Sequence, residues 1–249
     1  MAGHSHWAGI KHKKALVDNK RGKLWSKLSK AIIIAAKLGG GDPDANIRLR
    51  KAIDDAKAVS MPKDNIERAI KRGTGELEGG NVEEILYEGY GPGGVAILCE
   101  IMTDNRNRTA PELRTVFSRH GGNLGGTGCV AYLFDRKGLF VFAPPYNEEA
   151  ITIVALENGG EDVQVVEEDK LQVTSSPEVF ASLGEAFAAA DLVAEYSEVT
   201  RIPQNMAEVD SGTARSCLKL LEALDDHDDV QNVFTNLDVP ADVVAEMNE

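Results

Sequence analysis

The pattern of apolar residues changes at the glycine-rich segment Gly73–Gly80, and this change most constrains the fold. Before the segment, apolar residues recur at steps of three and four, the period of a helix with one buried side. Beyond it, short apolar runs typical of strands alternate with helical stretches. The segment itself combines glycine with small polar residues and lacks periodicity, as linkers do. The sequence therefore predicts a helical N-terminal domain joined to an α+β body.

Three helices are expected in the first 75 residues. The first spans Lys20–Leu38 and is followed by three glycines. The second covers Asp42–Val59 and opens with an Asp-Pro pair, a cap residue before a proline that suits the first helical position. The third covers Lys63–Arg72. Three helices of this length predict a small bundle.

The α+β body contains nine expected strands and four expected helices. The strands are Val82–Tyr90, Val95–Thr103, Cys129–Phe134, Leu139–Phe142, Asp162–Val166, Leu171–Thr174, Val193–Thr200, Asn205–Val209 and Val230–Leu237. The helices are Thr109–His120, Asn147–Asn158, Pro177–Ala190 and Ser211–Leu224. In the first of them Thr109 is the expected cap, with Glu112 completing a capping box.

This order of elements contains the ferredoxin-like motif β-α-β-β-α-β twice. One copy runs without interruption from Leu139 to Thr200, and the other is formed by the elements on either side of it. The fold class predicted is therefore α+β multidomain: an N-terminal three-helix domain plus two ferredoxin-like α+β domains, one inserted in the other. The expected domains are a basic helical domain at 1–76, an outer domain at 77–137 and 203–249, and an acidic inserted domain at 138–202.

Charge is divided unequally along the chain. The whole sequence has a formal net charge of −13, which by itself argues against a nucleic-acid partner. Residues 1–75, however, carry 17 Lys/Arg and 7 Asp/Glu, a net charge of +10, and residues 76–249 carry 10 and 33, a net charge of −23. Such a division indicates a polyanion partner for the basic part. A basic face that only meets solvent is the alternative.

The N-terminal tail and the first helix hold the main candidate site, where an aromatic side chain is surrounded by cationic ones. Such a surface can stack on bases of RNA while it contacts phosphate. The candidate residues are His4, His6, Trp7, Lys11, His12, Lys13, Lys14, Lys20, Arg21, Lys23, Lys27 and Lys30. Lysines contact phosphate without reading bases, so affinity without base specificity is expected. The alternative is a tail whose tryptophan packs on the first helix.

A second basic cluster lies between an expected strand and an expected helix. Its residues are Asn105, Arg106, Asn107 and Arg108. A helix N-terminus offers free N–H groups and the positive end of the dipole, which suit an anion. In the alternative interpretation Asp104 pairs with an arginine and the asparagines only hold the turn.

Other motifs do not indicate catalysis or a metal. The tail histidines match no known zinc spacing and have no cysteine or acidic ligand nearby. His227 lies in the run Asp225–Asp229, where a solvated acidic connection is expected. The segment His120–Gly128 is rich in glycine but lacks a phosphate-loop signature, so positive φ angles or close backbone approach are expected. Three cysteines without paired spacing fit a reducing compartment. No GxSxG, HExxH or kinase motif is present, and nothing in the sequence nominates a Ser/His/Asp triad.

Several strings carry a family resemblance that covers essentially the whole chain. They are MAGHSHW followed by IKHKKA, then RGKLWSKL, LGGGDPDANIRLRKAI, MPKDNIERAIKRG, YEGYGPGGVA, TDNRNRT and HGGNLG. With them the chain resembles the YebC/PmpR family, whose bacterial members bear the name probable transcriptional regulatory protein and whose organelle relatives are described as translational activators of cytochrome c oxidase. The resemblance implies an N-terminal helical domain and two α+β domains, one inserted in the other.

The resemblance also implies a non-enzymatic nucleic-acid binder. Some members are considered DNA-binding transcriptional regulators, and others act at the ribosome and help translation through proline-rich stretches. The expected partners are therefore ribosomal RNA or promoter DNA, and the ribosome itself. We expect a cytoplasmic monomer with no cofactor, no small-molecule substrate and no membrane contact. The longest apolar run, Ala31–Ala36, is far shorter than the ~20 residues that span a bilayer. A protein-interaction module that uses the acidic lobes is the competing class.

Overall fold

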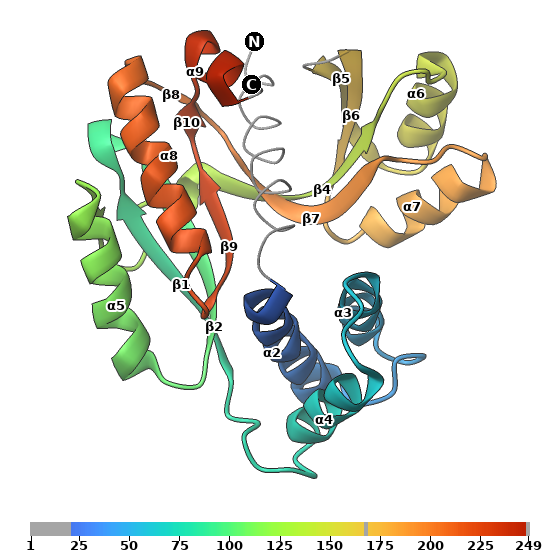
Figure 1. Cartoon of the computed structure of the whole chain (residues 1–249). Helices are drawn as coiled ribbons and strands as arrows, with labels where there is room; N and C mark the ends of the chain where they lie inside the picture. Colours follow the sequence, from blue (N-terminus) through green and yellow to red (C-terminus); the bar gives the residue numbers. More distant parts are fainter. Residues whose placement is uncertain (1–20, 167–168, 248–249) are drawn as a thin grey trace. The chain divides into compact units, whose positions relative to one another are not determined.

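The computed structural model describes residues 21–166 and 169–247 (Figure 1). The chain divides into two compact units. Of the described residues, one unit contains 21–131 together with Asp210–Thr235, and the other contains Tyr132–Val209 and 236–247.

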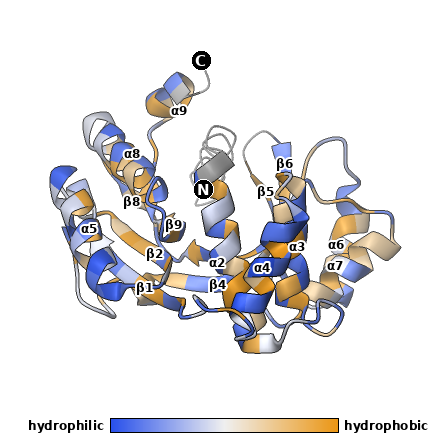
Figure 2. Ribbon diagram, turned by 60° about the horizontal axis from the view of Figure 1, so that its bottom comes forward, coloured by the Kyte–Doolittle hydropathy of each residue, from blue (hydrophilic) through white to orange (hydrophobic). Residues whose placement is uncertain are grey.

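The N-terminal part of the first unit is the expected three-helix bundle. Its helices are α2 (Arg21–Gly39), α3 (Ile47–Ala58) and α4 (Lys63–Gly73). The run Ile32–Ala36 in α2 is buried and packs with the inner sides of α3 and α4. Figure 2 shows hydrophilic and hydrophobic residues alternating within α3 and α4, as in helices with one buried side. Met102, from the neighbouring sheet, belongs to the same core.

The second helix begins later than the sequence predicts. The expected start at Asp42 is wrong, because the chain turns there and α3 begins at Ile47 with Asn46 as its N-cap. The Asn46 side chain accepts a hydrogen bond from the Leu49 amide at 3.0 Å and donates to the Ala35 carbonyl at 2.8 Å. An asparagine that caps one helix and also bonds the preceding helix is favoured over the Asp-Pro pair.

The first unit also contains a four-stranded sheet with the order β3-β1-β2-β9 (Figure 1). Its strands are β1 (Glu83–Tyr90), β2 (Ala96–Thr103), β3 (Asn123–Leu124) and β9 (Val230–Thr235). A short 3-10 turn, η1 (Pro92–Gly94), joins β1 to β2. The helices α5 (Arg106–Arg119) and α8 (Ser211–Asp225) cover one face of this sheet. Their shared core contains Ile97, Cys99, Ile101, Leu113, Phe117, Leu220, Leu224 and Val230.

Two of the strands predicted for this outer domain are not in its sheet. Cys129–Phe134 is wrong as a strand: Ala131–Leu133 forms the 3-10 turn η2. The Glu88 carboxylate accepts the amides of Val130 and Ala131, both at 2.8 Å, so these donors are unavailable to a strand ladder. Asn205–Val209 is reduced to the two-residue strand β8 (Ala207–Glu208), which pairs with β10 (Leu237–Asp238) in a separate sheet.

The strand β1 occupies the central position of the outer sheet that was expected for Asn205–Val209. It lies between β3 and β2 and pairs with β2 over its full length, Glu83 opposite Thr103 and Tyr90 opposite Ala96. The outer sheet therefore keeps the strand arrangement of a ferredoxin-like fold, but one central strand comes from before the motif instead of from within it.

The inserted domain has the predicted β-α-β-β-α-β order. It contains β4 (Phe134–Phe142), α6 (Glu148–Glu157), β5 (Gly160–Val166), β6 (Lys170–Ser175), α7 (Phe180–Ala189) and β7 (Tyr196–Pro203). The sheet order is β5-β6-β4-β7, with every neighbouring pair antiparallel, as a ferredoxin-like fold requires. Phe187 packs edge-on against Phe140 and Phe142 in its core.

The last helix, α9 (Ala241–Met247), follows β10. The predicted α+β fold class, with a helical domain before the sheet domains, is confirmed.

Candidate nucleic-acid interface

The lysines of α2 contact the segment Asp225–Asp229, which we name the acidic loop. Lys23 Nζ donates to the Asp226 carbonyl at 2.9 Å. Lys27 Nζ donates to the Asp225 carbonyl at 2.5 Å and lies 3.5 Å from its carboxylate. These carbonyls belong to the last residue of α8 and to its C-cap, where acceptors have no partner within the helix and the dipole is negative. The two lysines therefore complete the C-terminus of α8.

Asp229 lies at the centre of a network that joins four elements. Its side chain is 1% exposed, and one oxygen accepts a hydrogen bond from Lys30. The other oxygen accepts from Arg108 Nη2 at 2.8 Å, Thr109 Oγ1 at 2.6 Å and Thr103 Oγ1 at 3.1 Å. Burial by itself would raise the pKa of Asp229, but the hydrogen bonds from Lys30, Thr109 and Arg108 outweigh it and hold the pKa well below its usual range.

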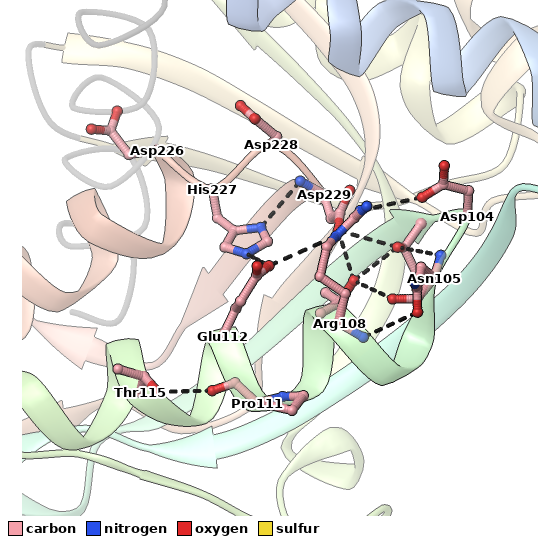
Figure 3. A network of polar contacts seen from close by, with 12 residues as sticks. Asp104, Asn105, Arg108, Pro111, Glu112, Thr115, Asp226, His227, Asp228 and Asp229 are labelled. Carbon is pink, nitrogen blue, oxygen red and sulfur yellow. Dashed lines mark hydrogen bonds and ion pairs between the residues drawn. The ribbon is translucent and has the colours of Figure 1, made fainter.

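The Asn/Arg cluster between β2 and α5 is partly used in local structure (Figure 3). Asn105 is the N-cap of α5, and its side chain accepts a hydrogen bond from the Arg108 amide at 3.1 Å. Arg108 Nη2 also lies 3.2 Å from an Asp104 carboxylate oxygen. Asp104, Asn105 and Arg108 therefore act as in the alternative interpretation, in which an aspartate pairs with an arginine and an asparagine holds the turn. Arg106 and Asn107 are exposed, and their contact with phosphate stays a prediction.

The predicted cap of this helix is wrong. Thr109 lies inside α5, which begins at Arg106, and its hydroxyl oxygen lies 3.0 Å from the Asn105 carbonyl oxygen while its single proton is donated to Asp229. Asn105 has a non-helical backbone, as a cap residue requires, and asparagine ranks above threonine in that role.

His227 is not in a solvated connection, contrary to the prediction. Its side chain is only 13% exposed, and Nε2 lies 3.1 Å from Glu112 Oε2 (Figure 3). Its Nδ1 accepts the amide of Asp229 at 3.1 Å. The acidic loop folds onto the protein because lysines and an arginine from two other elements neutralise its charge.

The same cluster places Glu112, His227 and Asp229 with ligand atoms within 4.8 Å of one another. Both oxygens of Asp229 already accept hydrogen bonds, from Lys30 and Arg108 among others. Two fixed cations beside the same carboxylate oppose a third positive charge. We therefore assign no metal to this cluster.

A polar cleft of about 660 Å³ opens beside the network. It is lined by Lys23, Ser26, Lys30, Asp104, Arg108, Glu112, Asp226, His227, Asp228 and Asp229. Because carboxylates outnumber lysines and arginines here, the cleft is a poor site for a phosphate group. A nucleic-acid contact is better sought among cations outside it.

Most of the predicted tail site lies outside the described residues. This applies to His4, His6, Trp7, Lys11, His12, Lys13, Lys14 and Lys20, and Arg21 is described only as the first residue of α2. Their contact with nucleic acid stays a prediction.

A second buried carboxylate, that of Glu88, is absent from the residues that the sequence analysis singles out. Its side chain accepts the amides of Gly128 at 2.6 Å and of Val130 and Ala131 at 2.8 Å. Glu88 is 3% exposed, in a strand whose other glutamates are exposed. The glycine-rich loop thereby held has positive φ at Gly121 and Gly128, as expected. The sequence signal available was a glutamate between apolar positions of an expected strand.

The cysteine thiols lie in environments that do not favour the thiolate. Burial raises the pKa of Cys99 to about 12 and that of Cys217 to about 11. Desolvation also raises the pKa of Cys129. Nucleophilic cysteines require the opposite shift.

Among the helices of the described residues, none combines the length and apolarity needed to cross a membrane.

Comparison with known proteins gives one consistent result. Residues 5–76 match the TACO1/YebC protein N-terminal domain, and residues 82–237 match the TACO1/YebC second and third domain. A probable transcriptional regulatory protein of Rhodopirellula baltica is 65% identical over 246 residues, covering 99% of this chain and all of that one. One of Natranaerobius thermophilus is 54% identical, covering 96% and 97%.

A solved structure agrees with these relatives. The crystal structure of a conserved hypothetical protein from Aquifex aeolicus matches with a TM-score of 0.81 and 49% sequence identity, covering 94% of this chain and 97% of that one. With both domain descriptions matched and relatives this similar over their full length, the chain belongs to the TACO1/YebC family.

Proposed function

We propose that the protein is a non-enzymatic, nucleic-acid-binding regulator of gene expression that binds through its basic N-terminal helical domain. The observation that carries the proposal is the division of charge, +10 in residues 1–75 against −23 in the remainder. The names of the relatives, probable transcriptional regulatory proteins, support a regulatory role.

Ribosomal RNA is the target that this charge division favours. Wrapping a duplex would bring phosphates near the acidic body, and the repulsion acts within about 8–10 Å of the surface at physiological salt. Docking only the basic domain into ribosomal RNA avoids that cost. With the family resemblance, this favours a cytoplasmic, monomeric, ribosome-associated factor that assists translation of proline-rich stretches.

A DNA-binding transcriptional regulator is the second candidate, favoured by the names of the relatives. A protein-interaction module is the third, favoured by the acidic charge beyond residue 75. It requires a basic partner protein instead of a nucleic acid.

The proposal predicts strong salt dependence of binding. Neutralising about six phosphates gives a slope of log K against log salt of about −4 to −5. Binding of the full chain to labelled oligouridine and to labelled duplex DNA, followed by fluorescence anisotropy across a salt series, measures it. Failure to bind either probe at low salt would favour the protein-interaction module.

Two further measurements test the details. Replacing Lys11, Lys13 and Lys14 by glutamine should flatten the salt slope, and an unchanged slope would remove the tail from the interface. Gradient sedimentation of lysate separates the targets: migration with ribosomes supports translation, and chromosomal footprints without it support transcription.

A further inference from the structure

Three cations on α4 form an exposed cluster, which we name the α4 patch: Arg68, Lys71 and Arg72. They are spaced i, i+3 and i+4, so they lie on the same face of the helix. The opposite face of α4 holds Ile66 and Ala69, which are buried in the bundle core.

Among the described side chains of the helical domain, the cations of the α4 patch differ from the others in making no hydrogen bond or ion pair. Nine other lysines and arginines of this domain, among the described side chains, make a hydrogen bond or ion pair. They are Lys23, Lys27, Lys30, Lys37, Arg48, Arg50, Lys51, Lys57 and Lys63. Within residues 21–166 and 169–247, the three side chains of the α4 patch have no such partner.

The neighbouring charges show that pairing is the local pattern. Lys51 lies 3.4 Å from Asp55 on α3, and Lys63 lies 3.5 Å from Glu67 one turn before the α4 patch. Opposite charges at this spacing stabilise a helix, and like charges destabilise it by similar amounts. Asp64 and Glu67 stand four residues before Arg68 and Lys71, but Glu67 pairs with Lys63 and neither acid pairs with the α4 patch, whose three like charges are left together.

The helix dipole accounts for only part of the α4 patch. Lys71 and Arg72 lie in the last turn, where positive charge interacts favourably with the C-terminal carbonyls. Arg68 lies a turn earlier, where this effect has largely decayed.

We propose that the α4 patch is the surface through which the helical domain contacts nucleic-acid phosphate. The inference rests on the proposed function and assigns its contact to residues that sequence patterns did not single out. The two arginines of the α4 patch suit contact with phosphate, because a guanidinium binds phosphate through two parallel hydrogen bonds. The α2 lysines, in contrast, would first have to leave the acidic loop.

The test compares two triple variants of the full chain that remove the same charge from the same domain. Arg68→Gln/Lys71→Gln/Arg72→Gln removes the α4 patch, and Lys51→Gln/Lys57→Gln/Lys63→Gln removes three cations paired to carboxylates. All six side chains are exposed and glutamine is a good helix former, so both variants should fold, which circular dichroism checks. The probes are labelled oligouridine and labelled duplex DNA, each across a salt series.

Loss of three phosphate contacts should weaken binding about 50-fold at physiological salt and flatten the salt slope by about 2 to 3. The control variant should stay within about threefold of the wild type, since its cations are already neutralised. Whichever probe shows this difference identifies the nucleic acid bound. If the wild type binds and both variants weaken binding equally, the α4 patch is overturned while the proposed function stands. If the wild type binds neither probe, both are overturned.

Discussion

Arg108 and Asp229, separated by 121 positions in the chain, are joined by a 2.8 Å hydrogen bond between Nη2 and Oδ2. The arginine lies in the first turn of α5, and the aspartate ends the acidic loop just before β9. Lys30 from α2 binds the other oxygen of the same carboxylate. This contact therefore ties the helical domain to the outer sheet through a single buried charge.

Replacing Asp229 by asparagine should destabilise the protein. The amide group would turn N–H donors toward Lys30 or Arg108, and the loss of a buried, fully bonded carboxylate costs about 2–4 kcal/mol, discounted here because Arg108 is 44% exposed. Urea unfolding measures the difference. Asp228→Asn is the matched control, because Asp228 is exposed, and it should change stability by less than about 0.5 kcal/mol. Equal effects of the two changes would contradict the network.

The same carboxylate predicts loss of stability in acid. Because hydrogen bonds from Lys30, Thr109 and Arg108 lower the pKa of Asp229 below its ordinary value near 4, its contribution is present above about pH 4 and declines as the pH falls below that. The unfolding free energy of Asp229→Asn should therefore approach that of the wild type as the pH drops below about 4. Thermal melts of both proteins between neutral and acid pH test this. If the stability difference between the wild type and Asp229→Asn does not change with pH, the charge of Asp229 is not the source of the stabilisation.

Local patterns in the sequence predict most of the helices and the whole inserted domain. The apolar stripe of α2 and the element order from β4 to β7 depend on neighbours within a few residues, which the sequence displays. The outer sheet was predicted less well, because its composition depends on Glu88, whose contacts with Val130 and Ala131 lie about forty residues away. No local period encodes such a contact.

In the candidate site, too, features set by neighbouring residues can be predicted from the sequence, and contacts between distant residues cannot. The lysine face of α2 was predicted from helical spacing, but its contact with the acidic loop joins residues about 200 positions apart. Charge runs read along the chain suggested a solvated acidic connection around His227 and a free basic helix. Folding brings the two together and leaves the α4 patch exposed instead.

Lys30 should contribute more to stability than lysines paired on the surface. Its side chain is 18% exposed and its partner Asp229 is buried, so Lys30→Gln should cost about 1–3 kcal/mol. Lys51→Gln is the control, since the Lys51–Asp55 pair is largely exposed and such pairs contribute about 0–1 kcal/mol. Urea titration of both variants gives the comparison, and a smaller loss for Lys30 than for Lys51 would count against the docked position of α2.

Glu88 should hold the glycine-rich loop. In Glu88→Gln, an amide replaces the carboxylate that accepts three backbone N–H groups, and the expected loss is about 2 kcal/mol. Hydrogen exchange should accelerate at Gly128, Val130 and Ala131. Glu83→Gln removes an exposed glutamate from the same strand and should leave this exchange unchanged. Protection that persists in Glu88→Gln would mean that other contacts hold the loop.

Gly73 should be required for close packing of α4 on α2. A Cβ at this position would lie 2.5 Å from the Ile33 carbonyl oxygen and 2.7 Å from the Ala36 Cβ, so Gly73→Ala must push the two helices apart. Overpacking of this kind costs about 1–3 kcal/mol. Gly126→Ala is the control, because a Cβ there meets no atom within 4 Å. Differential scanning fluorimetry should show a lower Tm for Gly73→Ala alone, and a Tm equal to that of Gly126→Ala would disprove the close approach. Because α4 carries the exposed arginines and lysine proposed to contact phosphate, Gly73→Ala should also weaken nucleic-acid binding at temperatures where the chain remains folded.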